Sequence, residues 1–320
     1  MLRGVTMCAL SISTAENKCN DIEALALMVE SGICLAVGGG LSSREPMALI
    51  RSIIRNNVSN LTVVGSAHGI DIDLLCGANA VSASQESYVG FEQDFGMAQN
   101  YRQGCESGKI EIQDNCCYTL VQQLRASIQG LPFMPIQSVR GTDFEKNPRY
   151  KTIQCPYSGE DILVVPPLTP DVAILHAQYA DSHGNLRIEG PPVVDLLFAQ
   201  ASKKVLATVE KIVTSEEMQQ LGGANIPYFY VTKFAKVPMG AHPTACYPFY
   251  AYDREHTKLY VSAAKEGSDA FQNKYLKHFV YDCESHDEYL DRIGGANTKS
   301  KLSSWKDSND AWMELYKERA

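Results

Sequence analysis

The sequence predicts an α/β fold in which an open, mostly parallel sheet is covered by helices on both faces. Short apolar runs that resemble buried strands alternate with segments whose apolar residues recur at helical spacing. This alternation is typical of a parallel sheet that is buried on both sides. The chain has 320 residues, 45% of them apolar, which is enough to bury a large core.

The first strand and its flanking helices are predicted near the N-terminus. A capping-box pattern that begins at Asn20 predicts a helix whose apolar residues recur at helical spacing until Gly32. Residues 33–37 then form an apolar run, typical of a buried strand, which ends in three consecutive glycines. Ser42 or Ser43 is expected to cap the following helix, which has Pro46 in its first turn.

The same alternation continues through the rest of the chain. We expect further strands over 61–64, 87–90, 172–176 and 205–209, and helices over 70–76, 97–105, 118–127 and 192–201. The polar segment 142–161 predicts a long loop or hinge inside a single domain that spans 1–320. A helix over 303–318, with Trp305 and Trp312 near one face, is expected to dock on that domain.

Composition excludes several classes of function. The net charge is -8 and no basic stripe is present, so a nucleic acid would be repelled. No apolar run approaches the roughly 20 residues that span a bilayer, and the short run 7–10 does not form a signal peptide. The ten cysteines follow no metal-binding or disulfide spacing. We therefore expect a cytoplasmic protein with reduced thiols, no metal, and no nucleic-acid or membrane partner.

Two glycine-bearing loops follow predicted strands, at the edge where open α/β sheets bind ligands. The first loop consists of three glycines, Gly38, Gly39 and Gly40. The second contains Ser66, His68 and Gly69. Glycine lets the backbone approach a ligand and present N–H groups to an anion or an oxyanion. Ser66 and His68 could hydrogen-bond a substrate carboxylate or thioester carbonyl, although a local loop contact explains His68 equally well.

The first loop and its surroundings resemble the signature of the alpha subunits of class I coenzyme A transferases. In that signature a glycine precedes an apolar strand, followed by Gly-Gly-Phe, a short spacer and a proline. Gly32, the strand, the first two loop glycines and Pro46 fit it. Ser31 stands where Asp or Asn is usual, Gly40 where Phe is usual, and Arg44 where Gly is usual.

Segments farther along the chain resemble the glutaconate type of these enzymes. They are residues 130–135 (Gly-Leu-Pro-Phe-Met-Pro), 170–178 (Pro-Asp-Val-Ala-Ile-Leu-His-Ala-Gln), 181–185 (Asp-Ser-His-Gly-Asn), 240–243 (Gly-Ala-His-Pro) and 286–290 (His-Asp-Glu-Tyr-Leu). The likeness extends over most of the chain, from about residue 23 to residue 290. It implies the open α/β sheet of the class I CoA transferases.

The resemblance also implies a mechanism and a partner. In this family a glutamate carboxylate attacks an acyl-CoA thioester, and the resulting glutamyl-CoA thioester passes CoA to an acceptor acid. Such chemistry needs an ionised carboxylate, donors for the oxyanions and a pocket that excludes water. Two-subunit members carry the glutamate on the beta chain, so this chain is expected to be an alpha subunit in a heterodimer, heterotetramer or larger assembly. The coenzyme A thioester is then a substrate, and no bound cofactor is expected.

Few residues of this chain are candidates for direct roles. Glu30 and Glu106 each begin a Glu-Ser-Gly element like the one around the family's nucleophile, but both fit ordinary helix ends capped by glycine. Glu92 is the candidate acid-base or substrate-orienting residue, with a surface glutamate at a loop start as the alternative. Cys117, near a predicted helix start, is a pocket candidate, with a buried structural cysteine as the alternative. Gln178 is a pocket candidate beyond a strand end, whereas His176 fits a core histidine.

Three functional interpretations remain open. The first is transfer of CoA between an acyl-CoA and an acid such as a glutaconate-like dicarboxylate or a 3-oxoacid. The second is a diverted CoA-ester hydrolase, cleaving rings or carbon-carbon bonds, or a decarboxylase. The third is a non-catalytic metabolite-sensing module, against which stand the missing helix-turn-helix and basic patch. Four arginines could pair with the second carboxylate of a dicarboxylic acid: Arg44, Arg102, Arg125 and Arg140.

Overall fold

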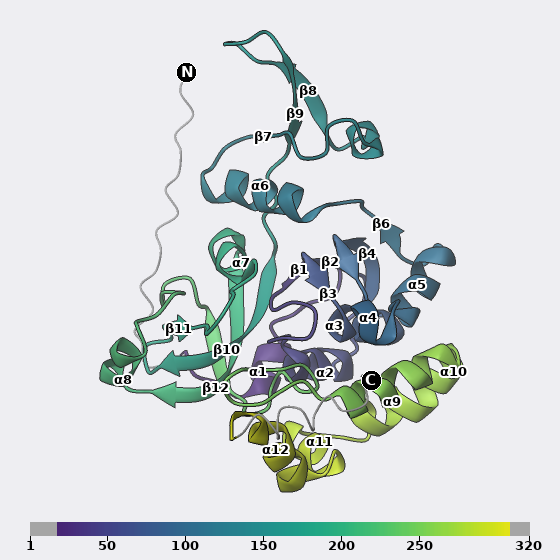
Figure 1. Cartoon of the computed structure of the whole chain (residues 1–320), viewed down its shortest axis with the longest axis vertical. Helices are drawn as coiled ribbons and strands as arrows, with labels where there is room; N and C mark the ends of the chain where they lie inside the picture. The colour runs from purple at the N-terminus through teal and green to yellow at the C-terminus, as the bar shows by residue number, and fades with distance from the viewer. Residues whose placement is uncertain (1–17, 308–320) are drawn as a thin grey trace.

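The computed structural model of the protein describes residues 18–307 (Figure 1). Its centre is an eight-stranded sheet with the order β13-β12-β10-β1-β2-β4-β6, and β11 pairs with β10. All of these strand pairs are parallel except the pair of β10 and β11, so the predicted mostly parallel sheet is confirmed. The strands are β1 (Cys34–Val37), β2 (Leu61–Val64), β4 (Val81–Gln85), β6 (Glu111–Ile112), β10 (Val172–Asp181), β11 (Leu186–Arg187), β12 (Lys204–Val213) and β13 (Lys233–Lys236).

Helices cover both faces of the sheet, as predicted. Successive side chains of a strand point to opposite faces, so Leu35 and Val37 of β1 pack into one buried cluster and Ala36 packs into another. The first cluster includes α1 (Ile22–Ala26), α2 (Met47–Arg55), α3 (Ile70–Gly77) and α9 (Arg254–Lys265). The second includes α6 (Cys117–Ile128) and α7 (Asp195–Ala201).

The remaining helices are short or lie towards the C-terminus. They are α4 (Glu92–Phe95), α5 (Gln99–Glu106), α8 (Ser215–Gln220), α10 (Ser268–Phe271) with its π-helical continuation η3 (Gln272–Tyr281), α11 (His286–Arg292), α12 (Gly295–Ser303) and η4 (Ser304–Lys306). Of the predicted helix 303–318, only the start lies within the described residues, and Trp312 lies outside them. No described helix has the length and apolar character that a membrane span requires.

The strand order changes direction between β1 and β10. From β1 the chain adds β2, β4 and β6 on one side, and later β10, β12 and β13 on the other. The connections therefore leave β1 and β10 in opposite directions, which opens a crevice at the carboxyl ends of these strands. This crevice is the place at which a ligand site is expected.

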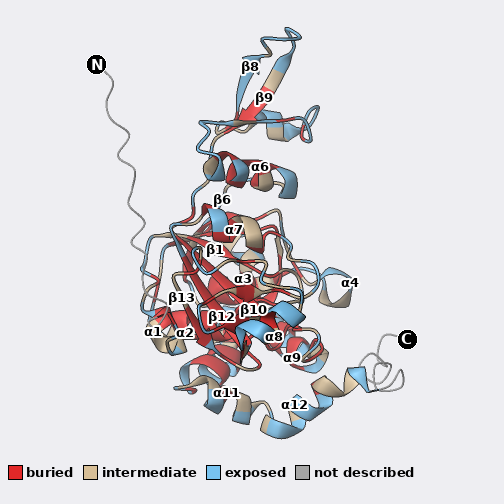
Figure 2. Ribbon diagram, turned by 90° about the vertical axis from the view of Figure 1, so that its left-hand side faces the viewer, coloured by how far each residue is buried: buried red, intermediate tan, exposed pale blue. Residues whose placement is uncertain are grey.

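A small antiparallel sheet projects from the body beyond α6 (Figures 1 and 2). Its strands are β7 (Met134–Ile136), β9 (Asp161–Val165) and β8 (Lys151–Gln154), and the turn η2 (Asp143–Lys146) lies between β7 and β8. Ile136, Val139 and Tyr150 belong to its own small core. The loop interpretation of 142–161 is therefore wrong at β8. All four β8 residues are exposed, so no apolar face marked the strand in the sequence.

Three local predictions need correction. Asp21 rather than Asn20 caps α1, because its side chain accepts a hydrogen bond from the backbone N–H of Ala24. Neither serine caps α2, which begins after Pro46 without a side-chain cap. The strand expected over 87–90 is reduced to β5 (Tyr88–Val89), which pairs with β3 (Ala67–His68), and the main strand in this region is β4.

Candidate active site

A pocket of about 680 Å³ opens at the carboxyl edge of the sheet. The loop after β1 contributes residues 41–43, β3 contributes Ala67, and the segment after β5 contributes residues 90–94. The segment 245–252 closes another side. The pocket therefore lies where the strand order predicts a ligand site.

The pocket has aromatic walls and two carboxylates at its edge. The aromatic side chains are those of Tyr88, Phe91, Tyr247 and Tyr252. Glu92 and Asp94 also line it, and Asp94 lies 3.8 Å from the Arg254 guanidinium. Within the described part of the chain, the lining contains no lysine or arginine. None of the four arginines proposed for a dicarboxylate thus reaches this pocket.

A second hollow of about 480 Å³ shares Ser43 and Tyr247 with the first. Gln178, a predicted pocket residue, lines this second hollow, but its amide is already bonded to the backbone of two wall segments. The amide nitrogen donates to the carbonyl oxygens of Tyr247 and Glu189, and the amide oxygen accepts from the Glu189 N–H. Gln178 therefore holds two wall segments together.

The three-glycine loop packs too tightly for side chains. A Cβ on Gly38 would lie 2.5 Å from Leu175 and 2.6 Å from the Asp195 carboxylate, and Gly39 has a φ of +83°. The Gly39 N–H donates to Asp195 at 3.0 Å, so this amide is occupied within the chain. A Cβ on Gly40 would lie 3.2 Å from the Ala67 carbonyl oxygen, and the Leu41 N–H donates to that oxygen at 2.9 Å, which joins the two glycine-bearing loops. The glycines thus shape the floor of the pocket and do not line it.

Four titratable side chains form a buried group beneath these loops, here called the acid–histidine cluster: Glu45, His68, Asp71 and Glu86. His68 Nδ1 lies 2.5 Å from Asp71 Oδ2. Burial lowers the pKa of His68, but Asp71 and Glu86 outweigh this effect and raise it to about 9. Burial raises the pKa of Glu86 to about 8, and burial and the Asp71 charge raise that of Glu45 well above its usual range. His68 therefore makes a buried ion pair and does not line the pocket.

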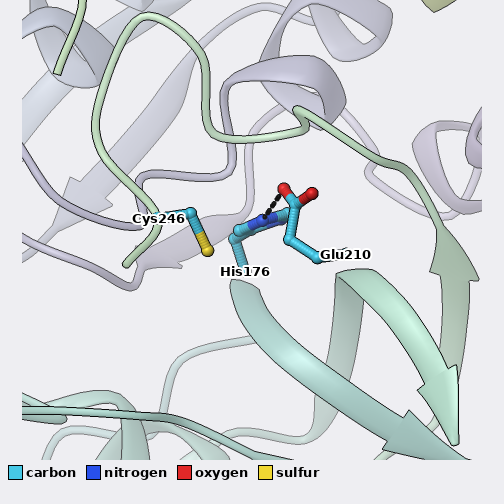
Figure 3. Close-up of side chains that lie close together, drawn as sticks. All are labelled: His176, Glu210 and Cys246. Atoms are coloured by element: carbon cyan, nitrogen blue, oxygen red, sulfur yellow. Dashed lines mark hydrogen bonds and ion pairs between the residues drawn. The ribbon is translucent and has the colours of Figure 1, made fainter. Parts of the chain in front are cut away.

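A second buried polar network supports the opposite wall (Figure 3). His176 Nδ1 lies 2.8 Å from Thr208 Oγ1 and its Nε2 lies 2.9 Å from Glu210, which confirms the expected core histidine. Glu210 also accepts hydrogen bonds from Tyr250 and from two backbone N–H groups of the segment 239–250. Cys246 points towards this pair (Figure 3). The three side chains have the types that bind metals, but the His176 nitrogens and the Glu210 oxygens already have partners. They instead hold the segment that carries Tyr247.

The other predicted residues fall into distinct places. Glu92 is exposed, begins α4 with a φ of +51° and lines the main pocket. Ser66 and Gly69 are buried below it. Cys117 is exposed at the start of α6, so the alternative of a buried cysteine is wrong for it. The α6 cap is Cys116, whose sulfur accepts from the Thr119 N–H.

The two Glu-Ser-Gly elements lie outside the pocket lining. Glu106 ends α5, and the Gly108 that follows has a φ of +72°, as a glycine helix end requires. Glu30 follows a turn, because α1 already ends at Ala26.

Comparison with known proteins identifies the family of this chain. Residues 20–233 match the family model described as coenzyme A transferase. The chain is 33% identical to the A subunit of glutaconate CoA-transferase from Acidaminococcus fermentans, over 85% of this chain and 90% of that one. The chain belongs to the coenzyme A transferase family. The crystal structure of the Acidaminococcus enzyme matches with a TM-score of 0.84 at 31% identity, and covers 89% of this chain and 95% of that chain.

Two further similar proteins carry different names. The IpdA subunit of a cholesterol ring-cleaving hydrolase from Mycobacterium tuberculosis is 31% identical over 78% of this chain and 89% of its own length. The structure of the decarboxylase AibA/AibB matches with a TM-score of 0.75 at 30% identity, over 81% of this chain and 98% of that chain. Family membership is therefore firm, and it leaves more than one type of reaction to consider.

Sequence reasoning missed several residues that build the site. Tyr247 and Tyr252 form walls, Asp195 anchors the three-glycine loop, and Asp71 and Glu86 complete the acid–histidine cluster. The aromatic run 247–252 was a signal that the sequence contained. The spacing of His68 and Asp71, three residues apart at a helix start, was another.

Proposed function

We propose that this chain is the alpha subunit of a heteromeric CoA transferase that moves CoA between an acyl-CoA and a carboxylic acid. The observation that carries the proposal is the pocket at the crevice between β1 and β10, in a chain that aligns with the A subunit of glutaconate CoA-transferase over nearly its whole length. A glutaconate-like dicarboxylate or a 3-oxoacid is the acid class that we favour. The coenzyme A thioester is a substrate here, and no bound cofactor takes part.

The nucleophile in this proposal is a glutamate of the beta subunit. Its carboxylate attacks the thioester carbonyl, the CoA thiolate leaves, and a mixed anhydride forms. The thiolate then attacks the glutamyl carbonyl, which releases the first acid and leaves a glutamyl-CoA thioester. An acceptor carboxylate reverses these steps. The pocket carboxylates of this chain, Glu92 and Asp94, belong to α4 at an exposed edge, so they suit an orienting role better than a nucleophilic one.

This chain would supply the wall and the floor of the shared site. Glu92 is the proposed acid-base or orienting residue, and Ser66 and Cys117 are the proposed polar contacts nearby. The loop glycines and Gln178 support them through the contacts described above. We propose that the chain works as one domain, in which the segment 142–161 belongs to a projecting subdomain, and that the complex is cytoplasmic.

A second candidate function rests on the two relatives with other activities. Identities of 31% to the IpdA chain of the ring-cleaving hydrolase and 30% to the decarboxylase are close to the 33% of the glutaconate transferase chain. A diverted hydrolase or decarboxylase of the same fold is therefore the alternative. It would be favoured by a beta chain that lacks the glutamate.

The test begins with the complex of this chain and its beta partner. The complex is incubated with an acyl-CoA and treated with borohydride or hydroxylamine, and the modified residue is mapped by mass spectrometry. We expect a tagged glutamate on the partner, transfer of CoA without net loss of thioester, and no exchange by the isolated chain. Hydrolytic carbon-carbon cleavage without a tag and with the thioester retained would support the hydrolase, and release of carbon dioxide with the thioester retained would support the decarboxylase. Full exchange by the isolated chain would refute the placement of the nucleophile.

A further inference from the structure

The acid–histidine cluster lies directly beneath the pocket, and the proposed reaction does not use it. Glu45 lies after β1, His68 in β3 and Asp71 in α3 lie after β2, and Glu86 lies after β4, so its members come from the segments that follow three strands. The same loops, or their continuations, contribute Leu41, Ala67 and Tyr88 to the pocket lining. Any change in the packing of the cluster therefore acts on three adjacent parts of the wall.

Asp71 is the centre of the cluster. One oxygen accepts hydrogen bonds from the backbone N–H groups of Gly69 and Ile72, at 3.0 and 2.8 Å, and the other faces His68 Nδ1. A carboxyl group surrounded by donors has the pattern of an ionised acceptor. Asp71 and Glu86 raise the pKa of His68 to about 9 although burial opposes them, so at neutral pH the imidazole carries the matching positive charge.

The two ends of the cluster, Glu45 and Glu86, are held differently from Asp71 and from each other. Among the residues that the structure describes, neither Glu86 oxygen nor His68 Nε2 has a hydrogen-bond partner. Glu45 faces the Asp71 carboxyl group and the Asp71 and Gly69 N–H groups, at geometry looser than a normal hydrogen bond. A Cβ on Gly65 would collide with both the His68 ring and the Glu86 carboxyl group, so these two side chains meet at that glycine. The acid–histidine cluster thus runs from Glu45 through Asp71 and His68 to Glu86, and it contacts all three segments.

Burial limits the net charge of the acid–histidine cluster. An ionised group without a partner is costly in a dry interior, and buried charges therefore occur as balanced pairs. One imidazolium balances one carboxylate, which leaves two of the three carboxyl groups to be neutral. The raised pKa values of Glu45 and Glu86 agree with this distribution.

We propose that the acid–histidine cluster is a positioning device for the pocket, which holds the three loops together only while Glu45 and Glu86 keep their protons. The cluster moves no proton to or from a substrate. It fixes where the loop backbones and Tyr88 lie. Loss of the Glu86 proton adds a second negative charge to the buried cluster, and the loops separate to admit water. This inference rests on the proposed function, because it assigns a role within the same site.

The described neighbours of the cluster offer no compensating charge. Asp195 faces His68 but is paired with Arg44. Tyr101 and Cys76 lie near Glu86, and Tyr252 lies near Glu45. Burial raises the pKa of each of these three groups, so they stay neutral in the range considered. Arg44 is thus the one cation among these described neighbours, and its charge is already paired with Asp195.

The pH dependence has a definite sign. A carboxyl group whose pKa is raised in the folded chain favours folding while protonated, and it loses this advantage as pH rises from its ordinary value through the raised one. For Glu86 this range runs from about 4.5 to about 8. His68 loses its charge near pH 9, so both groups weaken the cluster on the alkaline side. Glu86 and His68 interact, so their two deprotonations are coupled. We expect them to appear together as a single decrease of activity on the alkaline side of the pH profile, here called the alkaline limb.

The experiment compares pH profiles of CoA transfer by the alpha-beta complex. For the unmodified complex, kcat is expected to fall about 10-fold per pH unit above about pH 8, while KM changes little. The variant Glu86→Gln cannot ionise, so its alkaline limb should move up by at least about one pH unit, with kcat near pH 7 kept within about threefold. Glu111→Gln, an exposed glutamate on β6, is the matched control and should keep the original limb. An unchanged limb in Glu86→Gln would overturn the proposal.

A second measurement needs no activity. Infrared difference spectra of the complex between pH 6 and pH 10 report buried protonated carboxyl groups, and Glu86→Gln should remove one such signal that titrates near pH 8. If the complex shows this signal but transfers no CoA, the proposed function fails and the protonated cluster stands. If the signal is absent from the unmodified complex, the protonated cluster is refuted whatever the activity.

Discussion

Both terminal nitrogens of Arg44 face the Asp195 carboxylate, at 3.3 and 3.4 Å, and the two residues are 2% and 0% exposed. Asp195 also receives the Gly39 N–H. The arginine that stands where the family usually has glycine is therefore committed to this pair, and the pair fastens the three-glycine loop to α7. Arg44 cannot serve at the same time as the partner of a substrate carboxylate.

Removal of the Asp195 carboxylate should strongly destabilise the chain. Asp195→Ala leaves the Arg44 charge buried without its partner, which typically costs about 3–5 kcal/mol. Urea unfolding followed by circular dichroism would measure the loss. The exposed pair of Asp143 and Lys146 provides the control, and Asp143→Ala should leave the midpoint almost unchanged. Equal effects of the two variants would contradict the role given to Asp195.

Gly38→Ala should disturb the loop by steric conflict. Its Cβ would lie 2.5 Å from the Leu175 side chain and 2.6 Å from Asp195, so the loop or α7 must shift. We expect a loss of about 2–3 kcal/mol of stability and at least 10-fold lower transfer. Gly159→Ala is the comparison, because it places the same methyl group in open space at a φ of +73° and should cost only about 1 kcal/mol. A Gly38→Ala complex with normal kcat would show that the loop geometry is not limiting.

Glu92 and Ser66 test the composition of the site. Glu92→Gln keeps the size of a side chain that lines the pocket but removes its charge, and kcat/KM should fall at least about 10-fold. Ser66→Ala should give a smaller decrease that appears mainly in KM. Steady-state kinetics of the complexes, with Glu111→Gln as the control, would measure both. Full activity in both variants would remove these residues from the site.

The cysteines should react in an order set by their burial. Cys117 and Cys19 are exposed, whereas burial raises the pKa of Cys76 and Cys246 well above the usual range. Iodoacetamide at pH 8 should therefore label Cys117 and Cys19 before Cys76 and Cys246, as mass spectrometry of time points would show. If Cys117 borders the shared site, assembly with the beta chain should slow its labelling and leave Cys19 unchanged. Unchanged Cys117 labelling in the complex would place it outside the interface.

Acid should destabilise the chain through a buried histidine. Burial lowers the pKa of His256 to about 3, and its Nε2 lies 2.9 Å from the Tyr275 hydroxyl. In the unfolded chain the His256 imidazole binds a proton near pH 6.5, whereas in the folded chain it does so only near pH 3. The free energy of unfolding therefore decreases as pH falls from about 6.5 towards 3, by up to about 1.4 kcal/mol per pH unit. His256→Gln should flatten this decrease in urea titrations at pH 7, 6, 5 and 4. His183→Gln, at an exposed site, should not.

The fold was accessible from sequence because its strands carry a strong local signal. The strand at 61–64 and the helix at 70–76 are reproduced almost residue for residue. β4 and β8 were missed for a common reason: β4 contains two serines and a glutamine, and β8 is exposed along its whole length. In such strands the pairing with neighbours outweighs intrinsic preference.

The site was less accessible because its residues meet only after folding. Asp195 lies 156 positions from Gly39, and Glu86 reaches His68 across two loops. The wall residue Tyr247 depends on the network around Glu210, which no short motif in the sequence contains. The glycines were found because local conformation requires them, and their partners were not found because distance in the sequence hides them.

The central position of β1 has a consequence for how the chain is made. β1 pairs with β2 soon after both are synthesised, but its other neighbour, β10, begins 135 positions after Val37. Until β10 leaves the ribosome, the middle strand of the future sheet keeps an open edge that can pair with other chains. Such distant pairing slows folding and favours aggregation of partly made chains. Yield in a cell should therefore depend on chaperones that shield this edge during translation.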